Sequence, residues 1–329
     1  MTGAPSRHKR SAAKERRSII NASSVRYPRS AVPQPEVTIV IPSVNGVSDL
    51  SGCLTSLSLA ASTARMEVIV ADRCGGALPD FVRRNFPWVR ILSAPPDTPI
   101  PDLRAAAIDA ATSESIAVIE DHVQVPPTWA RAMLDAQARN GPVVGGVVVN
   151  AATSTVVDRA AFLCEYSHLL PPLPAGPTAT LAGNNVIYDR SLLRSHRHLL
   201  GHGLWEDHLH DGLRRSGIVL FCCPDIQVAH KQHVRFFEYL SQRYLYARSY
   251  AGARVAAKSV IARFAYGAAA VGLPPVLLTR IVLRIWRRPA YRAEVWTCWP
   301  LFVPFVTAWA LGEVVGAWFG SGRSLSRVR

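Results

Sequence analysis

The segment from Ser115 to Trp129 constrains the fold of this chain more than any other. Its sequence, SIAVIEDHVQVPPTW, is an apolar run that ends in two acids and a histidine, followed by two prolines and a tryptophan. Such a run predicts a buried strand, and the prolines end it. Open α/β sheets bind ligands beyond the carboxyl ends of their strands, so the acids are candidate ligand-binding groups. An acidic strand end can also be a solvated turn, and the neighbouring segments bear on this choice.

Two more candidate strands lie upstream. Residues 37–45 (VTIVIPSVN) and 67–72 (EVIVAD) are β-branched runs separated by a helix-length segment, 49–64. Continuous apolar strands around a helix predict a β-α-β unit with a parallel pair buried on both faces. A third strand, 89–92, and a helix, 103–111, lead into the acidic strand. No G-x-G-x-x-G follows the first strand and no G-x-x-x-x-G-K-[ST] occurs, which argues against dinucleotide-binding and P-loop proteins.

In this order the segments resemble the family 2 glycosyltransferases, and the resemblance covers roughly residues 36 to 235. It implies the α/β fold called GT-A, the nucleotide-diphospho-sugar transferase fold, in which helices flank a mostly parallel sheet. The matching pieces are Val37–Asn45 for the opening VxIVIPxxN strand, Asp72, Arg104, Glu120-Asp121-His122 for the D-x-D site, Gly183–Leu193 for the GxNxxxxRxxL segment, and Trp205–Leu209 with Gly217 for the ED motif.

The resemblance implies a set of residues that contact the nucleotide-sugar donor. Asp72 falls where the family contacts the nucleobase. Arg104 falls where a basic residue follows the third strand, although alanines replace the Asn and Gly that usually come next. The expected donor-binding residues are Pro42, Ser43, Asn45, Asp72, Arg104, Glu120 and Asp121.

A divalent metal, Mn²⁺ or Mg²⁺, is the expected cofactor. The outer D-x-D positions are Glu120 and His122, and Mn²⁺ accepts imidazole nitrogen as well as carboxylate oxygen. We expect Asp121 and His122 to bind the metal, with Glu120 behind them or on the ribose. His230 stands where the family often has a histidine after its last core strand, and a structural role for it is equally open. An acidic strand end that binds no metal is the other alternative.

The chemistry also needs a carboxylate that takes the proton of the acceptor hydroxyl. By resemblance this base is Asp207, with Glu206 as the substitute. Acids also stabilise a helix N-terminus, and both roles can hold for the same residues. The expected acceptor-side residues are Gly183, Asn184, Asn185 and Trp205. The Gln242–Tyr244 group matches the Q-x-x-R-W segment of processive members only loosely, which favours an enzyme that adds one sugar.

The positive charge of the chain lies at its two ends. The formal charge is +14, and residues 1–30 hold 8 Lys/Arg against 1 Glu, while residues 231–329 hold 15 Lys/Arg against 3 Glu. The core between them is mildly acidic, which argues against a nucleic-acid partner. Basic ends next to apolar segments suit an anionic membrane. Six cysteines without paired spacing indicate a reducing, cytoplasmic setting.

The apolar segments lie near the C-terminus. Residues 264–283 are interrupted by two prolines, and residues 296–319 have tryptophans at both ends. The second segment is long enough to span a bilayer, which takes about 20 residues. A shallow hairpin with its arginines on the cytoplasmic face agrees better with the positive-inside rule than two full spans. We expect a disordered basic arm at 1–35, a GT-A domain at 36–235 and membrane-associated helices at 236–329.

These features together predict an inverting, non-processive glycosyltransferase at the inner face of a cell or plasma membrane, with its catalytic domain in the cytoplasm. It would transfer a sugar from a nucleotide-diphosphate donor to a lipid-linked or polysaccharide acceptor. Two alternatives remain at this point. One is a nucleotidyl- or phospho-transferase on a similar fold, and the other is a catalytically silent membrane-bound scaffold, which the altered D-x-D segment makes conceivable.

Overall fold

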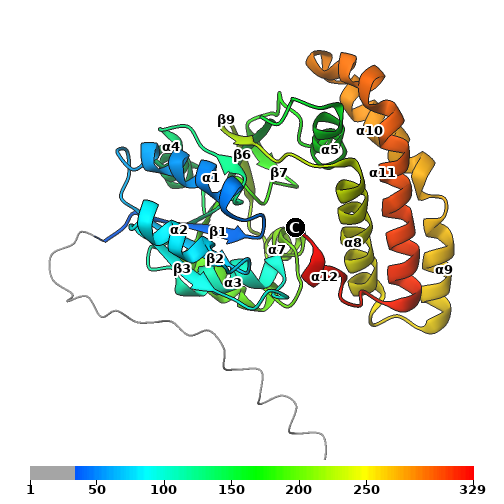
Figure 1. Cartoon of the computed structure of the whole chain (residues 1–329), viewed down its shortest axis with the longest axis horizontal. Coiled ribbons are helices and arrows are strands. Elements are labelled where there is room, and N and C mark those ends of the chain that lie inside the picture. Colours follow the sequence, from blue (N-terminus) through cyan, green and yellow to red (C-terminus); the bar gives the residue numbers. More distant parts are fainter. Residues whose placement is uncertain (1–33) are drawn as a thin grey trace, which may run out of the picture.

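A computed structural model describes residues 34–329 of the protein (Figure 1). The chain forms an α/β unit with a central sheet, and a layer of C-terminal helices lies beside it. This confirms the predicted α/β fold class with additional C-terminal helices. Of the predicted basic arm, only residues 34 and 35 belong to the described part of the chain.

The central sheet is mixed, and its strand order is β3-β2-β1-β4-β8-β6-β9-β5, with β7 paired to β9. β1 pairs in parallel with β2 and β4, and β6 pairs in parallel with β9. β8 runs antiparallel to both β4 and β6, so β6 and β9 point the same way as β1. The strands are β1 (Val37–Ser43), β2 (Met66–Asp72), β3 (Val89–Ser93), β4 (Ser115–Val118), β5 (Val123–Gln124), β6 (Val143–Asn150), β7 (Gly176–Thr178), β8 (Val186–Asp189) and β9 (Leu220–His230).

Helices cover both faces of the sheet, as the continuous apolar strands predict. Alternate residues of β1 face opposite cores: Ile39 and Ile41 pack with α1 and α4, while Val40 packs with α3 and α7. The helices of this unit are α1 (Val47–Ala60), α2 (Leu78–Asn85), α3 (Ile100–Ala110), α4 (Trp129–Asn140), α5 (Val156–Tyr166), α6 (Arg190–Ser195) and α7 (Glu206–Arg215). The strands and helices predicted for residues 37–119 are all present, and α2 is an addition to them.

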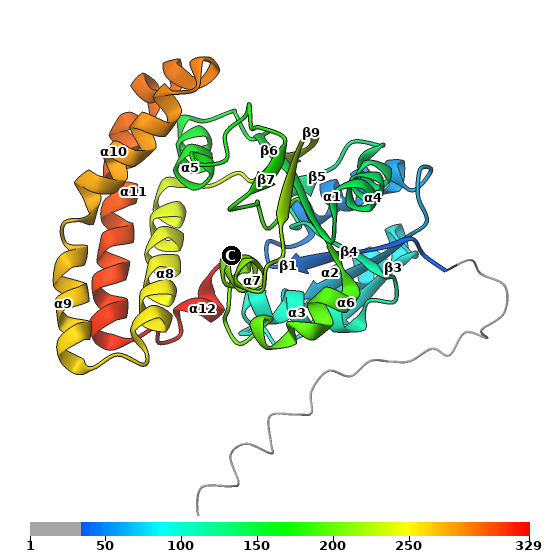
Figure 2. The same ribbon diagram turned by 180° about the vertical axis from the view of Figure 1, so that it is seen from behind.

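The C-terminal helices stand side by side at one end of the sheet unit in both views (Figures 1 and 2). Phe302 and Phe305 of α11 are fully buried, in the same apolar core as α5 and the sheet. The helices therefore pack onto the α/β unit, and the proposed boundary at residue 235 separates sequence regions that share a core. The C-terminal helices are α8 (Phe236–Val255), α9 (Val260–Ala270), α10 (Leu273–Trp286), α11 (Arg292–Phe319) and α12 (Ser324–Arg327).

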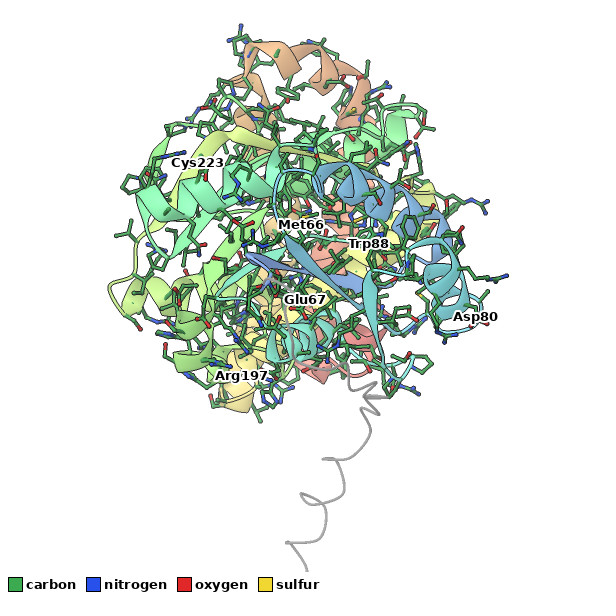
Figure 3. All side chains as sticks on the ribbon, turned by 90° about the vertical axis from the view of Figure 1, so that its left-hand side faces the viewer. Met66, Glu67, Asp80, Trp88, Arg197 and Cys223 are labelled. Atoms are coloured by element: carbon green, nitrogen blue, oxygen red, sulfur yellow. The ribbon has the colours of Figure 1, made fainter. Side chains whose placement is uncertain are left out.

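The amino ends of the parallel strands form an edge closed by hydrogen bonds. Figure 3 labels Met66 and Glu67 at the start of β2. The Glu67 carboxylate accepts hydrogen bonds from Thr38 Oγ1 at 2.6 Å and from the backbone and side chain of Thr112 at 2.8 Å. The candidate ligand-binding residues lie at the opposite, carboxyl edge, where β1, β2, β4, β6 and β9 all end.

Candidate active site

Three side chains converge at the carboxyl edge of the sheet. Glu120 and His122 follow β4, and His230 is the last residue of β9. His122 Nε2 lies 2.9 Å from His230 Nε2 and 3.3 Å from Glu120 Oε2. One ligand atom from each residue lies within 4.8 Å of the others, and both histidines are buried. Two imidazole nitrogens and one carboxylate oxygen are a donor set that fits Mn²⁺. The structure thus brings together His122 and His230, both predicted as metal ligands, and Glu120 is the third residue of this cluster.

Asp121 has different partners from those predicted. It is 1% exposed, and its carboxylate accepts hydrogen bonds from the backbone N–H of Val44 at 2.7 Å and of Asn45 at 2.9 Å. The Asn45 side-chain amide donates to the second oxygen at 2.8 Å. Asp121 thus fixes the loop after β1, and it is not one of the three convergent residues. Asn45, predicted to bind the donor, is held by this carboxylate.

The two histidines titrate in opposite directions. Burial lowers the pKa of His122, but hydrogen bonds to Asp121 and Glu120 outweigh it and raise the pKa to about 10. Burial and the neighbouring positive charge of His122 lower the pKa of His230 to about 3. Burial raises the pKa of Glu120, but its hydrogen bond to His122 and the charges of His122 and Arg104 lower it further, to a net value below the ordinary range. A metal here would have to displace the proton of His122, since only neutral imidazole binds metal.

Arg104 joins this cluster to the ED segment. Its guanidinium donates to Glu120 Oε1 at 2.8 Å and forms an ion pair with Glu206. Its side chain is 9% exposed. Burial lowers its pKa, but the two carboxylates outweigh this and raise it above its ordinary value. Arg104 therefore lies between Glu120 and Glu206. The segment predicted to bind the donor and the segment predicted to carry the base meet at this arginine.

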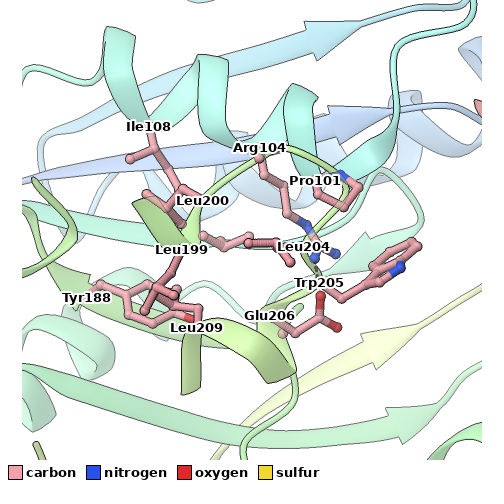
Figure 4. Close-up of a pocket in the computed structure, with 13 residues that line it drawn as sticks. Pro101, Arg104, Ile108, Tyr188, Leu199, Leu200, Leu204, Trp205, Glu206 and Leu209 are labelled. Atoms are coloured by element: carbon pink, nitrogen blue, oxygen red, sulfur yellow. Dashed lines mark hydrogen bonds and ion pairs between the residues drawn. The ribbon is translucent and has the colours of Figure 1, made fainter. Parts of the chain in front are cut away.

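A mostly apolar pocket lies next to this ion pair (Figure 4). Arg104 and Glu206 point toward each other at its rim, and Tyr188 and Leu209 line its far side. Gly183 also borders it, and a Cβ at this position would lie 2.4 Å from the Glu206 side chain. The glycine predicted on the acceptor side is thus needed for the close approach of α7.

Asp207 follows Glu206, which borders the pocket, in the first turn of α7. Helix α7 begins at Glu206, after the extended backbone of Trp205, so both acids occupy its first turn. The Asp207 side chain is open to solvent, and among the described residues no hydrogen-bond partner of its carboxylate is found. Neighbouring protein atoms displace part of the water around its carboxyl group, and this loss of water, together with the negative charges of Glu206 and Asp211, raises its pKa to about 6. A carboxylate with this pKa suits a general base near neutral pH.

The remaining donor-side residues line the ends of β1 and β2. Asp72 is 1% exposed, and its two oxygens accept the backbone N–H groups of Cys74 at 2.8 Å and Gly75 at 3.1 Å. Burial raises its pKa. Pro42 and Ser43 end β1, and the buried Ser43 hydroxyl has no hydrogen-bond partner among the described residues. An unpaired buried hydroxyl is consistent with a ligand contact at this position.

The two asparagines of the acceptor-side segment have separate places. Asn184 donates to Glu120 at 3.1 Å and to the hydroxyl of Tyr166 at 2.8 Å, so it belongs to the site. Asn185 is fully buried, accepts from Trp129 Nε1 at 3.0 Å and donates to two carbonyls of the core. Its side chain holds strands together and is not placed to touch an acceptor.

Two residues next to predicted site residues were not themselves predicted. Tyr166, at the end of α5, contacts the site through Asn184, and nothing in its sequence context marks it. Arg73 follows Asp72 directly and is 7% exposed, and its position next to a strand-end acid was a usable signal. Trp205, predicted on the acceptor side, stacks on Tyr250 with ring centres 5.9 Å apart.

Comparison with known proteins identifies the family. The family model for glycosyl transferase family 2 matches residues 38–197, which include the strand-end acids but not Glu206, Asp207 or His230. Among solved structures, the chain is similar to residues 1–349 of TarS from S. aureus, with 12% identity, a TM-score of 0.45, and coverage of 85% of this chain and 90% of that chain. The curated protein sequences give no match. Residues 38–197 therefore form a glycosyl transferase family 2 domain, in agreement with the predicted family and with the GT-A type of fold described above.

Proposed function

We propose that this chain is a metal-dependent, inverting glycosyltransferase that moves one sugar from a nucleotide-diphosphate donor to a lipid-linked or polysaccharide acceptor at the cytoplasmic face of a membrane. One observation carries the proposal: Arg104 joins Glu120 of the strand-end cluster to Glu206, the neighbour of the free carboxylate of Asp207. A candidate metal and donor site is therefore joined, through Arg104, to the residue next to the candidate base.

The residues divide the chemistry between them. Asp72 and the unpaired Ser43 hydroxyl lie where the strand ends would hold the nucleoside. Glu120, His122 and His230 would hold the divalent ion, which when bound supplies positive charge for the departing diphosphate. Asp207 takes the proton of the acceptor hydroxyl. At the same time the hydroxyl oxygen bonds to the anomeric carbon, and the bond between that carbon and the diphosphate breaks. Attack opposite the leaving group inverts the anomeric configuration.

A donor screen tests the function directly. We expect one nucleotide-diphosphate sugar, among UDP-, GDP- and dTDP-sugars with Mn²⁺, to raise the melting temperature of the full chain, because a ligand bound to the native state stabilises it. Incubation of that donor with the protein should release the nucleoside diphosphate. Release of nucleoside monophosphate or pyrophosphate would indicate a nucleotidyl- or phospho-transferase. Binding without any release, at every acceptor tried, would indicate a silent scaffold.

The metal site gives a second prediction. His122→Ala and His230→Ala should each weaken Mn²⁺ binding at least roughly tenfold, because each removes one of three proposed ligands, and even the loss of an outer-shell partner has an effect of about 10- to 100-fold. Titration calorimetry with Mn²⁺ measures this without a donor. The matched control is His196→Ala, since the His196 ring hydrogen-bonds with Leu192, Ser195 and Ser216, none of which belongs to the candidate site. Unchanged Mn²⁺ affinity in both site variants would refute the metal assignment, as would full activity in excess chelator.

The C-terminal helices are proposed to bind the membrane through one face. One helical segment, Pro289–Phe319, is long and apolar enough to cross a bilayer, and 44% of its most apolar stretch is buried in the protein. α9 and α10 are bent by 54° at their junction. α11 packs on α8, α9 and α10, while Trp296 and Trp299 of α11 and Ile261 of α9 are exposed. One apolar side and one packed side favour a helix that lies in the interface over an isolated span.

Vesicle binding tests this face. Ile261→Glu and Trp296→Glu should each reduce sedimentation with anionic vesicles roughly tenfold or more, because burying such a side chain in lipid contributes about 1.5–3 kcal/mol. Val219→Glu is the matched control, since Val219 is an exposed apolar residue of the α/β unit, directly before β9. Equal binding by all three variants, or a wild-type chain that stays in the supernatant, would contradict the proposal.

A further inference from the structure

The chain returns to the active site after its longest helix. Beyond α11 it turns through Gly320 and Gly322, whose φ angles of 78° and 52° favour glycine, and α12 then packs on α8. Gly252 of α8 makes room for the turn, because a Cβ there would lie 2.3 Å from the backbone nitrogen of Ser321. Figures 1 and 2 both show α12 between α8 and the α/β unit. We call residues 320–329 the tail.

The tail has an apolar anchor in the catalytic domain. Val328 is fully buried in a small cluster with Ile100, Trp205 and Leu245. Leu325 packs against the 201–205 loop, and a Cβ on Gly203 would lie 2.5 Å from its side chain. The tail is therefore seated by shape as well as by apolar contact.

Arg73 is the polar anchor. Its guanidinium donates to the carbonyl of Thr98 at 2.8 Å, to the carbonyl of Ser326 at 3.3 Å and to the carbonyl of Val328. The backbone N–H of Arg329 donates to Gln242 Oε1 of α8 at 2.8 Å. A buried guanidinium that satisfies three carbonyls holds the tail to the loop before α3.

These anchors touch the segments that carry the candidate site. Trp205 directly precedes Glu206 and Asp207, Ile100 begins the helix that carries Arg104, and Arg73 follows Asp72. The 201–205 loop is also held by the Asp102 carboxylate, which accepts the backbone N–H of His202 at 2.6 Å, and Val328 adds an apolar contact to Trp205, the residue directly before α7. Packing on Val328 therefore restricts where α7 can begin.

We infer that the tail is a clasp, and that Val328 and Arg73 are positioning residues that fix the 201–207 segment for catalysis. Its effect on turnover rests on the function proposed above, whereas its effect on the order of the loop does not. Because the tail continues α11, the clasp also connects the proposed membrane helix to the base.

The test combines hydrogen exchange with kinetics on the full-length chain. In Val328→Asp and in Arg73→Gln, amides of residues 202–207 should exchange at least roughly tenfold faster, while amides of β1, β2 and β4 keep their protection. Turnover should fall roughly 10²-fold with little change in the KM for donor, since small misplacements of catalytic groups have effects of this size. Val328→Ile, which keeps an apolar side chain, should retain the slow exchange of residues 202–207 and the turnover of the wild type. Arg327→Ala, an exposed residue of α12, is the matched control and should behave as wild type.

The outcomes separate the clasp from the enzyme assignment. Unchanged exchange of residues 202–207 in both anchor variants would overturn the clasp, and so would faster exchange with full turnover. If the wild-type chain transfers no sugar, the proposed function fails, while the exchange data still decide whether the tail orders the loop. Should Val328→Asp lose the protection of the strands, the variant is unfolded and Arg73→Gln decides.

Discussion

Asp207→Asn is expected to lower turnover about 10²- to 10⁴-fold, the usual contribution of a general base. Asparagine keeps the shape of the side chain but cannot take the proton of the acceptor hydroxyl. Donor binding should change little, because Asp207 is not among the residues proposed to bind the donor or the metal. Steady-state kinetics at saturating acceptor, together with donor affinity from calorimetry, measures the two effects separately.

The pH profile provides an independent check on Asp207. Desolvation and the charges of Glu206 and Asp211 raise its pKa to about 6, and Tyr250 of α8 is the titratable group that faces it from another helix. Only the ionised carboxylate accepts a proton, so wild-type turnover should fall about tenfold for each pH unit below 6. The residual turnover of Asp207→Asn should lack this limb.

Two controls define what would contradict the assignment. Asp211→Asn changes an exposed acid on the same helix that pairs with Arg214, and it should leave turnover nearly unchanged. Glu206→Gln should have a smaller effect than Asp207→Asn, since the free carboxylate remains. An inactive Glu206→Gln with a fully active Asp207→Asn would exchange the two roles. A loss of donor affinity as large as the loss of turnover would move Asp207 to the nucleotide site.

The first half of the fold could be predicted because local pattern and global topology agree there. Each β-branched run from Val37 to Ile119 is a strand, and its polar end lies at the ligand edge. The second half could not, because β8 enters the sheet between β4 and β6 in the antiparallel sense. Four residues, Val186–Asp189, carry no signal of direction, and their partners are distant in sequence.

The assignment of the metal ligands shows a finer limit. The sequence places three polar residues, Glu120, Asp121 and His122, after one strand, and any of them could face a metal. β4 ends at Val118, so the direction of each side chain depends on the turn that follows. That turn directs Asp121 to the backbone of Val44 and Asn45, which is a tertiary contact that no local pattern reveals.

The C-terminal region changes how the membrane prediction should be tested. The apolar run of residues 296–319 was found from composition, and the tryptophans at its start are indeed exposed. Composition could not show that Phe302 and Phe305 are buried in the core of the α/β unit. A chain shortened near Lys258 would expose that core, so substitutions on the outer face are the better experiment.

Arg104→Met is expected to lower the free energy of unfolding by about 3 kcal/mol at neutral pH, near the lower end of values for breaking a buried ion pair. The change leaves the carboxylates of Glu120 and Glu206, 21% and 27% exposed, without their shared cation. Arg104 helps to hold the pKa of Glu120 below its ordinary range, so the wild-type pair stabilises the fold above that range and loses its effect in acid. The difference between wild type and variant should therefore stay nearly constant from pH 7 to about 5, and it should shrink as the pH falls below the ordinary pKa of a glutamate carboxyl. Urea unfolding in detergent at several pH values measures it.

A surface pair of the same kind is the matched control. Arg197 forms two hydrogen bonds with Asp109, but the two side chains are 41% and 50% exposed, so solvent screens their attraction. Arg197→Met should lower stability by less than about 1 kcal/mol, with little dependence on pH. Adding Glu206→Gln to Arg104→Met should recover part of the loss, because one unpaired carboxylate is then gone. Equal losses in Arg104→Met and Arg197→Met, or no recovery in the double variant, would show that Arg104 does not hold the two acids together.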